Sequence, residues 1–303
     1  MQTYFFILYF FTYGFFGWCT EVAYAATQQR KFVNRGFLNG PICPVYGIGV
    51  GVVVQFLTPF ENNLFLLYIT STIVVTVIEG LTGYLMDKLF HHKWWDYTNQ
   101  PLNIGGYVCL LFSLAWGVAC VIIVKVIHPF IHKVLAWIPV KVGIALSVLL
   151  GMILVVDIVV TVSAVLKLNR RLEAMEKIAA ELREFSDKVG ENIYENVMET
   201  MEFQEEAKKQ LDSAALELRE KLETVSEEQK TRMAEQKERI TEQKNRMAEQ
   251  KARIEELKTK YAELAGRSTR VSIRLVKAFP KMESKHHKEI LEELKLRVKK
   301  NRK

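Results

Sequence analysis

Three carboxylic acids interrupt otherwise apolar stretches of this sequence, and their chemistry has to be explained first. They are Glu21, Glu79 and Asp157. An acid at the centre of a membrane helix costs about 2.5 kcal/mol or more, so it normally faces a partner or a water-filled cavity. Two interpretations follow. The acids bind a substrate or a proton, or they are structural residues paired with bases or hydroxyls, as Asp157 would be with Thr161.

Residues 30–47, RKFVNRGFLNGPICPVYG, form a segment that we call the floor segment. It is too rich in Asn, Gly, Pro and basic residues to face lipid, and too apolar for an ordinary hydrated loop. Backbone polar groups at membrane depth must be satisfied by protein when the chain is irregular. The Asn-Gly-Pro sequence within it is a turn signal. We therefore expect the floor segment to fold inward and close a cytoplasm-facing cavity.

The floor segment also carries the side chains best suited to meet the acids. Arg35 is the cation expected to contact Glu21 or Glu79, and Asn34 and Asn39 would complete a buried polar network. A second loop, residues 87–103, adds further candidates.

In that second loop Asp96 stands between aromatic residues, and Asn103 precedes two glycines. His91 and His92 are adjacent, so on a helix they would point about 100° apart and make a poor metal pair. The predicted substrate-binding residues are Glu21, Asn34, Arg35, Asn39, Glu79, Asp96, Asn103 and Asp157.

Enzymatic motifs are missing from the sequence. It contains no catalytic triad pattern, zinc signature or Walker A motif. The four cysteines have neither metal-ligand spacing nor a disulfide framework, which favours a packing role. We predict a protein that is not an enzyme, with no catalytic residue, no bound metal and no cofactor. Any ATPase that drives it would be a separate chain.

Five apolar segments approach the length of about 20 residues that a membrane helix needs. They lie at residues 4–26, 41–57, 64–86, 104–126 and 141–166. The first is not expected to be a cleaved signal peptide, because no basic residue precedes it. Small residues at helical spacing in each segment favour close packing of helices. The predicted fold is all-α, a polytopic membrane bundle of about five spans over residues 1–166.

Basic residues give the expected orientation. The loops after the first, third and fifth segments are basic, the loop after the second has no Lys or Arg, and the fourth loop runs against the pattern. The positive-inside rule then places the N-terminus outside and the C-terminus in the cytoplasm. We expect a multi-pass protein of the bacterial cytoplasmic membrane, with the lipid bilayer as its first partner.

Residues 167–266 change to heptads and predict a long cytoplasmic helix. A seven-residue repeat of the type EQKxRMA runs from residue 228 to 262, and glutamine fills one of its seam positions. Such a seam predicts a weak coiled coil, through which the chain could form a homo-oligomer, or a solvated helix held by Glu–Lys pairs. Gly190 and Gly266 are the expected breaks, and an unbroken rod would extend about 150 Å.

The tail, residues 267–303, is basic and amphipathic. Thirteen Lys and Arg stand against four Glu, so the tail carries +9 and the rest of the chain −2, which together give the net charge of +7. On a membrane protein, such a tail favours contact with anionic lipid. A simply solvated end is the alternative, and nucleic acid is not expected because no reading motif is present.

Several of these motifs resemble one family of bacterial membrane proteins. They are Gly17-Trp18-Cys19 with Glu21, KFVNRGFLNGPICPVYGIG, Glu79 with Thr82-Gly83, WWDYTNQPLNIGG, Leu110 to Gly117, and FPKMESKHHKEILEELK. Together they resemble the family called putative ABC-transporter type IV, also known as putative ABC transporter permease. The resemblance covers nearly all of residues 1–166 and the tail, and it implies transport.

The expected function is therefore a permease or transporter component that binds an unknown substrate in a cytoplasm-facing polar pocket. The alternative is a membrane-anchored coiled-coil scaffold without transport activity. An intramembrane enzyme acting on lipid is a third class, but the sequence shows no nucleophile–base constellation for it.

Overall fold

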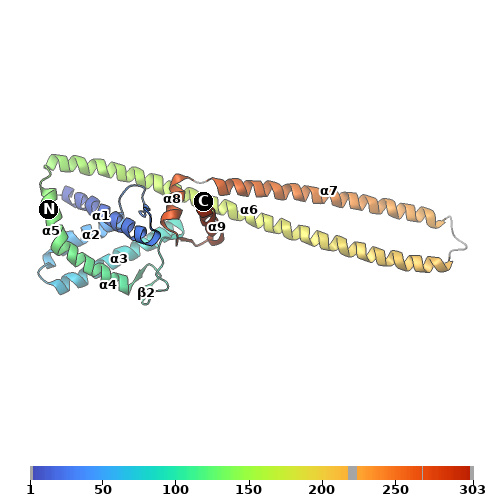
Figure 1. Cartoon of the computed structure of the whole chain (residues 1–303), viewed down its shortest axis with the longest axis horizontal. Helices are drawn as coiled ribbons and strands as arrows, with labels where there is room; N and C mark the ends of the chain where they lie inside the picture. Colours follow the sequence, from blue (N-terminus) through green and yellow to red (C-terminus); the bar gives the residue numbers. More distant parts are fainter. Residues whose placement is uncertain (1–2, 218–223, 268, 301–303) are drawn as a thin grey trace. The chain divides into compact units, whose positions relative to one another are not determined.

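The computed structural model describes residues 3–217, 224–267 and 269–300. Figure 1 shows a chain made almost entirely of helices. It divides into two compact units. The membrane unit comprises Met1–Leu172 and Ser268–Lys303, and the hairpin unit comprises Glu173–Arg267.

Helices make up most of the described residues. They are α1 Thr3–Gln29, α2 Pro44–Leu57, η1 Thr58–Phe60, α3 Leu64–Phe90, α4 Leu110–Ile122, η2 Ile123–Ile127, α5 His128–Ala136, α6 Val140–Glu217, α7 Thr224–Gly266, α8 Arg270–Ala278 and α9 Lys288–Lys300. The all-α prediction is confirmed.

Among the described residues, four stretches are long and apolar enough to cross a membrane, so the count of about five spans is not confirmed. They are Tyr4–Gln29, Leu64–Phe90, Leu110–Ala136 and Val140–Glu191. The second predicted segment forms only the 14-residue α2, which begins at a proline. At the helical rise this gives about 21 Å, short of the roughly 30 Å of a bilayer core.

The predicted span over residues 104–126 is displaced along the chain. Its first residues form a small antiparallel hairpin instead, with β2 (Asn103–Ile104) paired to β3 (Val108–Cys109). The apolar helix then runs from Leu110 to Ala136 and includes one π-helical turn, η2. Hydropathy alone could not distinguish the short hairpin from the start of the apolar helix, because apolar residues of a strand and of a helix give the same signal over so short a run.

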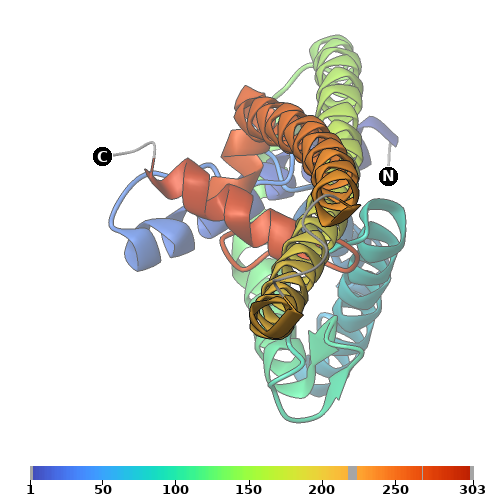
Figure 2. The same ribbon diagram turned by 90° about the vertical axis from the view of Figure 1, so that its right-hand side faces the viewer.

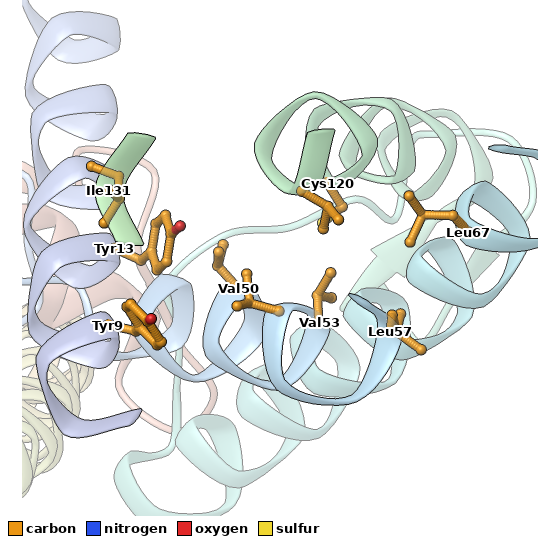
Figure 3. Close-up of a cluster of buried hydrophobic side chains, with 10 residues drawn as sticks. Tyr9, Tyr13, Val50, Val53, Leu57, Leu67, Cys120 and Ile131 are labelled. Carbon is orange, nitrogen blue, oxygen red and sulfur yellow. The ribbon is translucent and has the colours of Figure 1, made fainter. Parts of the chain in front are cut away.

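The core of the membrane unit lies around α2 (Figure 3). Tyr9 and Tyr13 of α1, Val53 of α2, Leu67 of α3 and Cys120 of α4 are all buried there. Seven of the fourteen residues of α2 are buried, so one face of this helix packs against the other helices of the unit. All four cysteines are free.

Glycine in α1 allows α1 and α2 to approach closely. A Cβ added at Gly17 would lie 2.3 Å from Cγ of Tyr46. We predict that Gly17→Ala destabilises the unit by about 1–3 kcal/mol, because the Tyr46 ring is held by a hydrogen bond to Glu21 and cannot move freely. Thermal unfolding in detergent, followed by size-exclusion chromatography, measures the change.

The matched control is Gly49→Ala, where nothing lies within 4 Å of the added Cβ. Alanine favours helix by about 1 kcal/mol over glycine, so this control should unfold at the same or a higher temperature. Equal unfolding temperatures for Gly17→Ala and the wild type would contradict the packing argument.

The hairpin unit contains the second half of α6 and the returning helix α7 (Figures 1 and 2). The two run side by side, with Arg253 of α7 3.8 Å from Glu181 of α6, and Leu257 is buried. The chain therefore does not form one rod of about 150 Å.

The predicted break at Gly190 is wrong, because α6 continues through it, whereas α7 does end at Gly266. Homo-oligomerisation through a coiled coil stays a prediction.

Candidate functional site

The carboxylate of Asp157 is surrounded by hydrogen-bond donors from the floor segment. Its Oδ1 accepts from the backbone N–H of Asn39 at 3.0 Å and from Asn39 Nδ2 at 2.9 Å, and its Oδ2 accepts from the backbone N–H of Gly40 at 2.7 Å. Thr161, one helical turn further along α6, donates to Oδ1 at 3.2 Å. The Asn-Gly-Pro turn aims two successive amides at one carboxylate. Asp157 thus has the hydroxyl partner that the structural interpretation predicted.

The side chain of Asn34 forms hydrogen bonds to α1 and to another residue of the floor segment. Its Oδ1 accepts from the indole of Trp18 at 2.7 Å, and its Nδ2 donates to the carbonyl of Asn39 at 2.8 Å. The two asparagines therefore belong to one connected network, as expected.

Glu21 and Arg35 form the ion pair expected between the first span and the floor segment. Nε of Arg35 lies 3.1 Å from Oε2 of Glu21, and both side chains are partly buried. The hydroxyl of Tyr46 donates to Oε1 of Glu21 at 2.7 Å, and the guanidinium of Arg35 lies 4.5 Å from the ring centroid of Tyr24. The predicted meeting of Arg35 with a span acid is confirmed.

Arg274 in the tail is a floor-segment partner that the sequence analysis missed. It donates to the carbonyls of Gly36 at 2.7 Å and Phe37 at 2.8 Å, and to Oδ1 of Asn39 at 3.2 Å. The signal available was the amphipathic pattern of α8, whose buried face includes Leu275. At least this basic residue of the tail binds protein rather than solvent or lipid.

A second set of contacts docks the tail on the loop after α3. Strand β4 (Glu283–Ser284) pairs antiparallel with β1 (His92–Lys93). Nζ of Lys285 lies 2.6 Å from Oδ2 of Asp87, whose exposed fraction is 2%. The hydroxyl of Tyr107 donates to the same oxygen at 2.5 Å. The tail is therefore not the simply solvated end that the sequence left open.

Histidine and tryptophan side chains complete this docking surface. Nε2 of His92 lies 2.7 Å from Oδ1 of Asn169, and burial lowers the pKa of His92. The ring of Trp94 meets those of Phe37 and Phe279, each at a centroid distance of 5.0 Å. Among the described residues, no group of three or more His, Cys, Asp or Glu could hold a metal ion.

Asp96 and Asn103 shape a turn. Oδ1 of Asp96 accepts from the backbone and hydroxyl of Thr98, and Asn103 donates to the carbonyls of Thr98 and Gln100. Burial raises the pKa of Asp96, but the Thr98 hydrogen bonds and the Lys93 charge outweigh it and hold the pKa below its ordinary value. Their described contacts lie within residues 93–109 and do not join the network around Asn39.

Glu79 differs from the other two span acids. Its Oε1 accepts from the hydroxyl of Tyr97 at 3.4 Å, while its Oε2 is buried without a hydrogen-bond partner among the described residues. Burial first, and then the nearby charge of Glu79, raise the pKa of Tyr97. No ion-pair partner of Glu79 occurs in the part of the chain that the structure describes. Tyr97 is not one of the predicted substrate-binding residues.

The described residues include four apolar helices of membrane length and a polar segment that pairs Arg35 with Glu21 and hydrogen-bonds Asp157. This arrangement defines a polytopic α-helical membrane protein. Residues 8–162 match a family model described as "Putative ABC-transporter type IV". The chain belongs to this family, and the match includes Glu21, Asn39, Glu79 and Asp157 but neither the hairpin unit nor the tail. No curated protein and no solved structure matched the chain.

Proposed function

We propose that this protein is a permease or transporter component that binds its substrate in a polar pocket bounded by the floor segment and Glu79. One observation carries the proposal. Glu21 is paired with Arg35 and Asp157 is hydrogen-bonded by the floor segment, whereas Glu79 keeps one buried carboxylate oxygen without a partner among the described residues. An unneutralised acid within a membrane span is by default a functional group.

The proposed orientation has the N-terminus outside and the floor segment facing the cytoplasm. It is supported by the basic residues that gather on the floor-segment side, namely Arg35, Arg274 and Lys285, in agreement with the positive-inside rule. A separate ATPase subunit would supply the energy, because the sequence has no Walker A motif.

A membrane-anchored scaffold is the second candidate function, and one observation favours it. Tyr194, Val197, Met198 and Met201 of the hairpin unit are exposed at helical spacing on α6. Such a stripe is a surface on which a partner helix could pack.

Complementation of a deletion strain separates the two functions. We expect Glu79→Gln, at normal protein level, to leave the metabolite profile of the deletion strain unrestored, since it removes the unpaired charge. A chain lacking residues 173–267 should restore that profile. Untargeted metabolite and lipid comparison is the measurement. Full restoration by Glu79→Gln, combined with failure of the shortened chain, would overturn the transport proposal in favour of the scaffold.

A further inference from the structure

The unpaired carboxylate of Glu79 lies among aromatic side chains from different elements. Tyr97 comes from the loop after α3 and donates its hydroxyl to Glu79, and the indole of Trp116 on α4 also faces this carboxylate. The ring of Tyr46 on α2 meets Trp116 edge-on at a centroid distance of 5.6 Å. Phe112, one helical turn before Trp116, stacks on Tyr97 at 4.9 Å.

Two of these rings are held in place by hydrogen bonds. The hydroxyl of Tyr46 is fixed by Glu21, which is itself paired with Arg35, and the hydroxyl of Tyr97 is fixed by Glu79. The rings therefore cannot turn away without breaking a polar contact. Through Tyr97 and Trp116, these paired rings form an aromatic cluster next to Glu79.

The neighbours of Glu79 bring hydrogen bonds to its carboxyl group but no positive charge. Tyr97 and Trp116 are neutral side chains. Arg35, the cation of the floor segment, forms its ion pair with Glu21. An acid in this situation attracts a cation from outside the protein. The site therefore selects for positive charge.

The type of cation follows from the atoms around the acid. Hard inorganic cations such as Ca²⁺ and Mg²⁺ require about six or more oxygen ligands. The oxygen atoms described at Glu79 are those of its own carboxylate and one phenol oxygen, and the rings that contact Tyr97 and Trp116 add aromatic carbon nearby. Aromatic faces bind organic ammonium groups through the ring quadrupole, as in aromatic cages for quaternary ammonium ligands.

We propose that Glu79, with Tyr46, Tyr97 and Trp116, binds the ammonium group of an organic amine or quaternary ammonium compound. This inference rests on the transport function proposed above and names its substrate class. Glu79 supplies the counter-charge, Tyr97 orients the carboxylate, and the rings of Tyr46 and Trp116 cover the ammonium carbons. Glu21 acts as a positioning residue through its hydrogen bond to Tyr46.

Reaction with a hydrophobic carbodiimide tests this site without knowledge of the natural substrate. The reagent reacts with the protonated form of a membrane-embedded carboxyl group, which a bound cation disfavours, and mass spectrometry of the purified full chain locates the adduct. We expect modification at Glu79, and slower modification, by about tenfold, when choline or tetraethylammonium is present. Sodium chloride and 3,3-dimethylbutan-1-ol, the neutral isostere of choline, should give no protection at equal concentration.

Variants and a direct titration keep the test decisive. Calorimetric titration of choline and tetraethylammonium should show binding that Glu79→Gln abolishes and that Tyr46→Leu weakens by about tenfold. Phe130→Leu, an exposed aromatic of α5, is the control and should change neither result. Equal protection by sodium, or failure of both ammonium probes to bind the wild type, would overturn the proposal.

The outcomes also separate this inference from the transport function. If Glu79→Gln fails to restore the metabolite profile and no ammonium probe binds, the protein transports but the substrate class is wrong. If ammonium binding is present and Glu79→Gln restores the profile fully, the site exists but the transport proposal fails.

Discussion

Replacing Asp157 by alanine is expected to release the floor segment. The substitution removes the acceptor of two backbone amides, those of Asn39 and Gly40, and of one side-chain amide. Each buried donor left without a partner costs about 1–3 kcal/mol. Because local opening controls amide exchange, the exchange rate of residues 36–40 should rise by at least about tenfold. Hydrogen–deuterium exchange with mass spectrometry in detergent measures this.

The effect should reach the tail. Arg274 donates to Asn39 and to the carbonyls of Gly36 and Phe37, so a floor segment that opens loses its docking of α8. We expect increased exchange in α8 as well. Asp187→Ala, which removes an exposed acid of the same helix, is the control. Unchanged exchange at residues 36–40 in Asp157→Ala would show that the carboxylate does not hold the turn.

Lys285→Ala is expected to destabilise the docking of the tail. The substitution leaves the carboxylate of Asp87, 2% exposed, without its cation. Breaking a buried ion pair costs about 3–5 kcal/mol, and since Lys285 is itself half-exposed we expect the lower end of that range. Thermal unfolding in detergent and limited proteolysis of the tail would both report the loss.

A double substitution distinguishes the ion pair from general damage. Asp87→Asn combined with Lys285→Ala removes the stranded charge and should recover most of the lost stability. Lys288→Ala, which breaks the exposed pair with Glu283, should cost at most about 0.5 kcal/mol. The explanation fails if the double variant is no more stable than Lys285→Ala.

Features that depend on local composition were predicted well. Apolar length identified α1 and α3 as membrane helices, and their bounds extend the predicted segments by a few residues. The floor segment was recognised from a mixture of residues unsuited both to lipid and to water. Arg35 of the floor segment contacts Glu21. Glu21 lies near the end of α1, the helix that directly precedes the floor segment.

Features that depend on packing were not predicted. The helix α2 has the hydropathy of a span, and only the structure shows that it is 14 residues long and packs one face against α1, α3 and α4. The heptads of residues 167–266 fit one long rod as well as two antiparallel helices. A heptad pattern predicts an apolar face on a helix but does not identify the helix that packs on that face.

The sequence by itself determined that this is a helical membrane protein with three span acids and a polar segment made to meet them. Apolar length and charge are properties of neighbouring residues, so they can be read along the chain. Tertiary structure alone decided how each acid is satisfied. Arg274 donates to Asn39, which is 235 positions away in the sequence, and Asn39 donates to Asp157, which is 118 positions away. Glu79 instead accepts a hydrogen bond from Tyr97, within a group of aromatic rings. A partner depends on which segments the fold brings together, and three acids that look alike in sequence therefore have three different environments.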